Sequence, residues 1–342
     1  MPSSTSSSSQ QAETARSSRA WLGGLVVAAV ILAGAELFWR SQGHRPSIVD
    51  DPALWAYQRE RVYERGPRTI VLLGMSRIQL GVAIPTFRER LPEYGVVQLA
   101  VAGRNPIATL RDLAEDEQFT GIVICAVTPP SLRGNELNGQ EEYVEFYHRE
   151  RSLNTRLNER IGWFLQQRLA VLNPQVRFLE ILSELVESRS LPHPNYVTTH
   201  FDRSRSADFA IVDAGSYRRD LVRRARDNYE SSLPPTPEEW LEEAMETAPI
   251  VESIQSRGGR VVFARFATSG KHHDLDEQYY PRREYWDRFA ARTPAVAIHF
   301  DDVPALSRFE LPDTSHLDYR DTAAFTEALI DELAQRGIIR IP

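Results

Sequence analysis

Two short stretches at opposite ends of the chain carry residue types that suit nucleophilic chemistry. Ser76 follows Gly74 and an apolar run, residues 69–73, that predicts a buried strand. Asp313 and His316 stand three positions apart near the other end. A serine hydroxyl is a weak nucleophile that needs a histidine base and a group to orient that base. Because a carboxylate at this spacing can reach one imidazole nitrogen and leave the other free, the residues predict a Ser-His-Asp site.

The same residues also have a structural interpretation. A serine after a strand is commonly a helix cap, and Asp313 could cap a helix in the same way. The α/β-hydrolase elbow, G-x-S-x-G, does not fit, because Ile78 occupies its last position. The catalytic interpretation therefore depends on both ends of the chain meeting in space.

The elements that must bring these residues together are strands alternating with helices. Helices are expected at 52–64 before the first strand, at 87–91 after it, at 105–117 after the second, at 236–257 after the third and at 319–336 after the last, where the helix is amphipathic. Parallel strands buried on both faces give such near-continuous apolar runs. The pattern predicts a three-layer α/β/α domain with a five-stranded parallel, flavodoxin-like sheet. Its expected strands are residues 69–73, 95–101, 121–127, 260–266 and 295–300.

Three blocks give the chain a resemblance to a known group. They are Gly74-Met75-Ser76-Arg77, Ala102-Gly103-Arg104-Asn105 and Asp313-x-x-His316-Leu317. In this order they resemble the blocks of the SGNH (GDSL-like) hydrolases and acyltransferases, over residues 68–130 and 258–335. The resemblance implies Ser76 as nucleophile, His316 as base and Asp313 as its orienting acid. It also implies that Gly103 lends an N–H to the oxyanion hole.

Two departures from that pattern bear on the chemistry. Met75 replaces an acidic residue, and the third block, G-x-N-D in the family, is Val127-Thr128-Pro129-Pro130 here. The second oxyanion donor is therefore open, with Asn105, Thr128 and Asn135 as candidates. Arg77 and Thr128 are candidates for substrate contact, and a structural salt bridge is the other expectation for Arg77.

An N-terminal apolar run predicts a membrane anchor. Residues 21–39 are long enough to cross a hydrocarbon core, with tryptophan at both ends. Residues 1–20, rich in Ser and Gln, predict a disordered cytoplasmic tail. Ala33-Gly34-Ala35 keeps a cleaved signal peptide open as the alternative. In both cases the rest of the chain is expected outside the cytoplasm, and the resemblance, whose anchored members act in the cell envelope, implies the periplasm or cell surface.

The remaining chain divides into three expected parts. Residues 40–66 predict a linker and a lead-in helix, and residues 67–342 predict the SGNH-like domain. Within that domain, residues 131–236 predict a helical insertion with no clear strand, acting either as a lid or as a solvated decoration. Residues 236–257 predict one helix, beginning with a Thr-Pro-Glu-Glu cap.

Composition narrows the classes of function. A formal charge of −7 gives no support for nucleic-acid binding. No phosphate-binding loop is present, and no cofactor is expected. The cluster His272-His273-Asp274-x-Asp276 predicts a solvated loop rather than a metal site. Cys125, inside an apolar run, predicts a small core residue.

The sequence-based hypothesis is a membrane-anchored serine esterase or O-acyltransferase. With the resemblance, the expected substrates are ester-linked acyl groups of cell-envelope carbohydrate, or other esters. For transfer, a membrane protein that donates the acyl group would be a further partner. The alternative is a catalytically inactive SGNH-like envelope protein that serves as a binding or assembly module, as the departures at Met75 and the third block suggest.

Overall fold

The computed structural model describes residues 7–133, 139–149 and 152–341 of the chain. Its contacts separate two compact units. Unit 1 comprises Met1–Ile48 and Gly162–Asn195, and unit 2 comprises Val49–Ile161 and Tyr196–Pro342. The residues expected to carry chemistry all belong to unit 2.

Unit 2 is built on a five-stranded parallel sheet with strand order β2-β1-β3-β6-β7. The prediction of an α/β fold with five parallel strands is thereby confirmed. β1 lies between β2 and β3, with Val71 opposite Val97 on one side and Val123 on the other. The strands are β1 (Thr69–Leu73), β2 (Gly95–Gln98), β3 (Ile122–Ala126), β6 (Arg260–Arg265) and β7 (Val296–His299).

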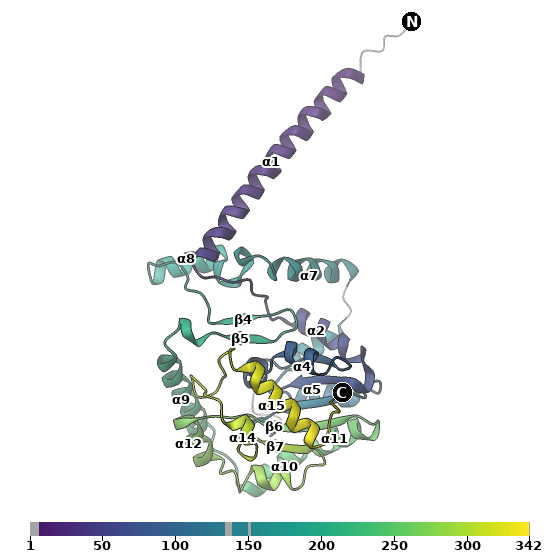
Figure 1. The fold of residues 1–342 in the computed structure, drawn as a ribbon, viewed down its shortest axis with the longest axis vertical. Coiled ribbons are helices and arrows are strands. Elements are labelled where there is room, and N and C mark those ends of the chain that lie inside the picture. The colour runs from purple at the N-terminus through teal and green to yellow at the C-terminus, as the bar shows by residue number, and fades with distance from the viewer. Residues whose placement is uncertain (1–6, 134–138, 150–151, 342) are drawn as a thin grey trace. The chain divides into compact units, whose positions relative to one another are not determined.

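Both faces of the sheet are buried, which explains why the strands read as continuous apolar runs. Alternate residues of β1 point to opposite faces: Val71 and Leu73 enter one core cluster, and Ile70 and Leu72 enter the other. Helices cover each face, so the domain has three layers (Figure 1). One face carries α2 (Pro52–Glu60), α5 (Ile107–Glu115), α10 (Pro237–Met245), α11 (Thr247–Ser256) and α13 (Trp286–Ala290). The other carries α3 (Ser76–Gly81), α4 (Ile84–Arg90), α14 (Pro304–Ser307) and α15 (Thr322–Gln335).

The expected single helix at 236–257 is two helices, α10 and α11. Its start is as predicted: Thr236 and Glu239 form a capping box. α10 ends at Met245 and α11 begins at Thr247, so Pro249 lies in the first turn of α11. Proline lacks the N–H that a continuous helix needs and clashes with the preceding turn, so it is tolerated only near a helix start.

The segment 131–236 differs from the prediction in containing strands. β4 (Val197–Thr199) and β5 (Arg205–Ala207) form an antiparallel pair. Each has only three residues, too few for a period-two pattern to be visible in the sequence. Its helices are α6 (Glu141–His148), α7 (Leu153–Gln166), α8 (Phe178–Glu187) and α9 (Ala214–Ser231), with short 3₁₀ turns between them. α6 packs on α2 and α5, and α9 packs on α12 (Gly270–Tyr279), so the ends of this segment belong to the body of unit 2.

Unit 1 contains the apolar N-terminal run as part of one helix, α1 (Ser7–Ser41). Residues 7–20 belong to α1, so the disorder expected for residues 1–20 is corrected there. Once a helix is established, each further residue adds one hydrogen bond, which favours its extension beyond the apolar run. Residues 1–6 lie outside the described part. Within the described chain, Ala20–Ser41 is the one helix long and apolar enough to cross a membrane, with mean hydropathy 2.0. None of its most apolar stretch is buried by protein, and a signal sequence has the same features.

Candidate active site

Ser76, His316 and Asp313 form a continuous chain of hydrogen bonds. Ser76 Oγ lies 2.8 Å from His316 Nε2, and His316 Nδ1 lies 2.7 Å from Asp313 Oδ2. Asp313 is fully buried, His316 is 9% exposed and Ser76 is partly exposed. Because the Asp313 carboxylate can only accept, His316 carries a proton on Nδ1 and donates it to Oδ2. In the neutral ring, Nε2 is then free to accept the Ser76 hydroxyl proton.

Gly74 allows the turn that places Ser76 beyond the end of β1. Its φ is +139°, a region that residues with side chains rarely adopt. A Cβ there would lie 2.8 Å from the carbonyl oxygen of Ala126 and 2.9 Å from the Ile78 side chain. The chain can therefore leave the sheet and begin α3 at once, which puts Ser76 in the first turn of that helix.

The Asp-x-x-His segment folds into a tight turn around the Asp313 carboxylate. Oδ1 accepts the backbone N–H of Ser315 at 2.9 Å and of His316 at 2.8 Å, leaving Oδ2 for the ring. Thr314 has a φ of +77°, a strained conformation for a β-branched residue. Burial raises the pKa of Asp313, but the hydrogen bonds from His316 and the two N–H groups outweigh it, so the pKa is lowered.

In the block at 102–105, the Gly103 N–H is available as a donor, whereas the Asn105 side chain is already hydrogen-bonded. Gly103 has a φ of +72°, and its N–H donates to no other described residue. The Asn105 side chain is 2% exposed: its Nδ2 donates to the Ser131 carbonyl at 2.9 Å, and its Oδ1 accepts the Ile107 N–H. Asn105 therefore holds the loop after β2.

The third block is organised as a cap. Thr128 begins the 3₁₀ turn Pro129–Leu132, and its Oγ1 and the Ser131 Oγ cap each other's backbone N–H groups. These interactions explain the T-P-P-S sequence after β3, and they use the Thr128 hydroxyl oxygen as an acceptor. Asn135, the remaining donor candidate, lies outside the described residues.

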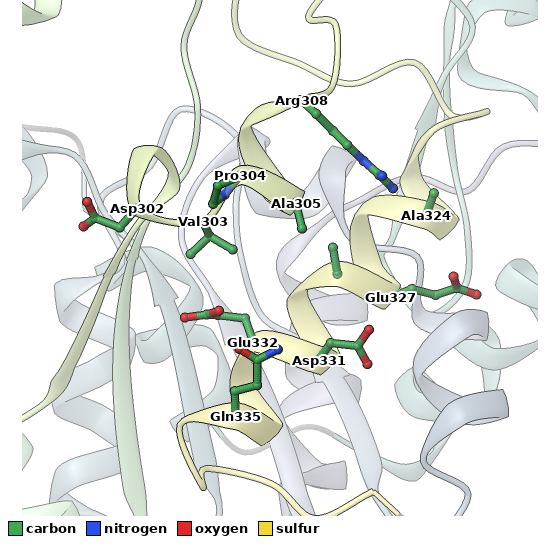
Figure 2. A pocket seen from close by; sticks show the side chains of 11 residues that line it. Asp302, Val303, Pro304, Ala305, Arg308, Ala324, Glu327, Asp331, Glu332 and Gln335 are labelled. Carbon is green, nitrogen blue, oxygen red and sulfur yellow. The ribbon is translucent and has the colours of Figure 1, made fainter.

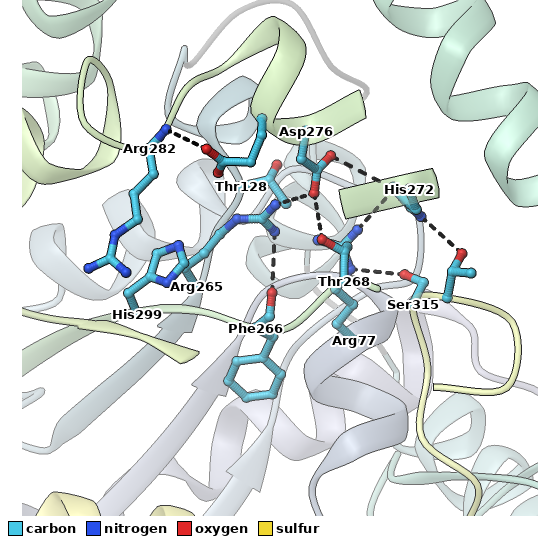
Figure 3. A network of polar contacts seen from close by, with 12 residues as sticks. Arg77, Thr128, Arg265, Phe266, Thr268, His272, Asp276, Arg282, His299 and Ser315 are labelled. Atoms are coloured by element: carbon cyan, nitrogen blue, oxygen red, sulfur yellow. Dashed lines mark hydrogen bonds and ion pairs between the residues drawn. The ribbon is translucent and has the colours of Figure 1, made fainter. Parts of the chain in front are cut away.

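Arg77 enters a buried polar network beside the serine rather than facing solvent (Figure 3). Its Nε donates to Ser315 Oγ at 2.9 Å, and its Nη2 lies 3.4 Å from His272 Nε2. Burial lowers the pKa of Arg77 to about 10, and nearby Arg265 acts in the same direction. The guanidinium is still a cation at neutral pH, and through Ser315 it braces the turn that carries His316.

The centre of this network is Asp276, which the sequence pattern places in a solvated loop. It pairs with Arg265 and accepts hydrogen bonds from the Tyr229 hydroxyl at 2.7 Å and the Thr268 hydroxyl at 2.8 Å. Burial raises the pKa of Asp276, but the cations of Arg265 and Arg77 outweigh it and lower the pKa. The available signal was Arg265, a cation that follows four apolar residues at the end of β6, because a cation buried there requires a partner.

The solvated loop expected at 272–276 is helix α12, and this is a correction. His272 and Asp276 are one helical turn apart, so both face inward and are buried. Burial lowers the pKa of His272 to about 4, with Arg77 adding to the effect. Because arginine only donates, His272 Nε2 accepts and the ring is neutral, although Asp276 lies 3.9 Å away. Within the described chain, no group of three metal-binding side chains is present.

A separate hollow lies between α14 and α15 (Figure 2). Its volume is about 600 Å³, and Asp302, Arg308, Glu327, Asp331 and Glu332 contribute its charged lining. None of the residues in the serine–histidine chain lines it. Ser76, Thr128 and Arg265 lie instead at the carboxyl ends of β1, β3 and β6. Parallel sheets place their ligands at this edge.

Comparison with known proteins adds little to the geometry. No family model matches the chain, and no curated protein matches it. Among solved structures, the chain is similar to one described as "Crystal Structure of TesA", at 12% identity and a TM-score of 0.33. That match covers 78% of this chain and 98% of the other. The likeness is too distant to carry an argument about the site.

Proposed function

We propose that unit 2 is a serine hydrolase or acyltransferase that acts on carboxylic esters. The observation that supports it most directly is the pair of contacts at 2.8 Å and 2.7 Å that joins Ser76, His316 and Asp313. A helix cap needs a serine hydroxyl or an aspartate, but it does not need a buried carboxylate and an imidazole in line with that hydroxyl.

In the proposed reaction, Ser76 Oγ attacks the ester carbonyl while His316 Nε2 takes the hydroxyl proton. Asp313 fixes the ring and stabilises the imidazolium that forms. The N–H groups of Gly103 and of the residues around Ser76 would stabilise the oxyanion. His316 then returns the proton to the departing alcohol, leaving an acyl group on Ser76.

Water or a sugar hydroxyl would resolve this acyl-enzyme, giving hydrolysis or transfer. The resemblance to anchored SGNH proteins supports cell-envelope carbohydrate as the ester substrate, or as the acceptor. With α1 as the anchor, unit 2 would act outside the cytoplasm. If transfer is the reaction, a membrane protein would deliver the acyl group.

Labelling with a fluorophosphonate tests the nucleophile directly, because the probe needs an activated serine and no particular leaving alcohol. The full-length chain in detergent should be labelled, and Ser76→Ala should abolish labelling. The matched control is Ser256→Ala, which removes an exposed hydroxyl at the end of α11. Labelling that survives in Ser76→Ala would reject Ser76 as nucleophile.

The binding-module alternative predicts a different result. If the third-block departure has ended catalysis, the folded wild-type chain should fail to react with the probe at any pH. Circular dichroism then separates an inactive protein from an unfolded one. For an active chain, release of acetate with and without an added glycan acceptor distinguishes hydrolysis from transfer.

A further inference from the structure

Helix α8 in unit 1 carries large apolar side chains on its surface. Phe178, Leu179 and Val186 are 73–75% exposed, and Leu182 and Leu185 are 47% and 44% exposed. Isolated apolar residues on a surface are normal, but a cluster on one short helix marks a site of interaction.

The apolar residues occupy one side of the helix. At 100° per residue, the six apolar side chains of α8 fall within an arc of about 160°, and its polar residues fill the opposite side. Glu180, Ser183, Glu184 and Glu187 make up that polar side. This separation is the pattern of a helix that lies at the boundary between an apolar medium and water.

Unit 1 holds the segment before α8 against the end of α1. The Glu36 carboxylate accepts the backbone N–H groups of Ala170 and Val171, each at 2.9 Å. Arg40 donates to the Arg168 carbonyl at 2.7 Å. A run of 3₁₀ turns, Ala170–Leu172 and Pro174–Val176, then leads directly into α8.

This attachment fixes where α8 lies relative to the apolar span of its own unit. The span Ala20–Ser41 has 22 residues, which is about 33 Å of helix and matches a hydrocarbon core of about 30 Å. Glu36 and Arg40 stand in its last turns, so they would sit where the core ends. Figure 1 shows α8 at that end of α1, running across the direction of the span.

We propose that α8 is a second membrane contact, lying in the lipid interface with its apolar side toward the acyl chains. The proposal rests on α1 spanning the membrane and is independent of the hydrolase function. Because the polar side of α8 is acidic, binding would come from apolar burial, not from attraction to anionic lipid headgroups.

Spin labels on the full-length chain in phosphatidylcholine vesicles test this placement. Leu182→Cys puts a label on the apolar side and Glu184→Cys puts one on the polar side; Leu179→Cys and Glu180→Cys repeat the pair if one variant fails to fold. Cys125 is fully buried, so it should not react. We expect the ratio of oxygen to nickel-chelate accessibility to be about tenfold higher at Leu182 than at Glu184.

Two comparisons make the result decisive. A label at Val27→Cys, inside the span, must be oxygen-accessible and nickel-protected, which verifies that α1 is inserted. Equal nickel accessibility at Leu182 and Glu184 would then overturn the proposal. Protection of Leu182 that disappears at one chain per vesicle would also overturn it, because a second copy of the protein would be covering α8.

Discussion

At the scale of single residues, Ser76 and His316 share one hydrogen bond and should act as a unit. We expect Ser76→Ala and His316→Ala each to lower the turnover of an acetyl ester by at least about 10³-fold, and the double variant to be no worse than either. Asp313→Asn should lower turnover less, since the Asp313 carboxylate orients the base and does not itself react. Steady-state kinetics check this, with circular dichroism as the folding control. A double variant whose loss of turnover equalled the two single losses combined would contradict a shared step.

Asp276 should matter for stability, because it is a buried carboxylate held by Arg265 and two hydroxyls. Its pKa is lowered by folding, so its contribution is present above the unfolded pKa and is lost as pH falls toward the folded one. Asp276→Asn should reduce the unfolding free energy by about 3 kcal/mol at pH 7 and by less at pH 3.

Urea denaturation at the two pH values measures this difference. The matched control is Asp220→Asn, whose ion pair with Arg223 is more than half exposed on both sides and should contribute less than about 0.5 kcal/mol. An Asp276 variant as stable as that control would mean that the network is neutral to stability.

At the scale of elements, the turn from β1 into α3 depends on a glycine. In Gly74→Ala, the new Cβ would meet the Ala126 carbonyl at 2.8 Å and keep a φ of +139°. We expect a loss of about 3 kcal/mol in unfolding free energy, with reduced serine labelling as Ser76 shifts. Gly258→Ala is the control: its φ is +87° but its Cβ would meet nothing, so it should cost about 1 kcal/mol. Equal losses would show that backbone conformation, not contact, decides the position.

At the scale of the whole molecule, the core clusters described for unit 2 contain only residues of unit 2. Deleting residues 1–40 should therefore leave its unfolding midpoint and its serine labelling unchanged. Deleting residues 1–19 is the control, since it keeps the apolar span. Thermal unfolding followed by labelling checks this prediction.

Membrane association of the same variants separates the two proposed contacts. The full chain and the chain without residues 1–19 should stay with vesicles after alkaline washing. The chain without residues 1–40 should be removed by that wash, because it has lost the span and the Glu36 and Arg40 contacts that hold the segment before α8; any binding to neutral vesicles that remains would come from α8. A chain found soluble with its anchor intact would contradict the role of α1.

Several features of this protein follow from the sequence alone because they are local. The five strands are apolar runs bounded by breakers, so their positions could be predicted within a few residues. Gly74 before Ser76 and the Asp313-x-x-His316 spacing indicate which side chains could act together. The 22-residue apolar helix is likewise visible in the sequence.

Only the tertiary structure decided which distant groups meet. Ser76 and His316 are 240 positions apart, and the return of the chain after β7 brings them to 2.8 Å. Arg265 falls in an expected strand and Asp276 in an expected loop, and no local pattern records that burial pairs them. The short strands β4 and β5 are stabilised by each other, so neither carries a signal by itself. Contacts of this kind depend on sheet order and packing, which a linear pattern does not contain.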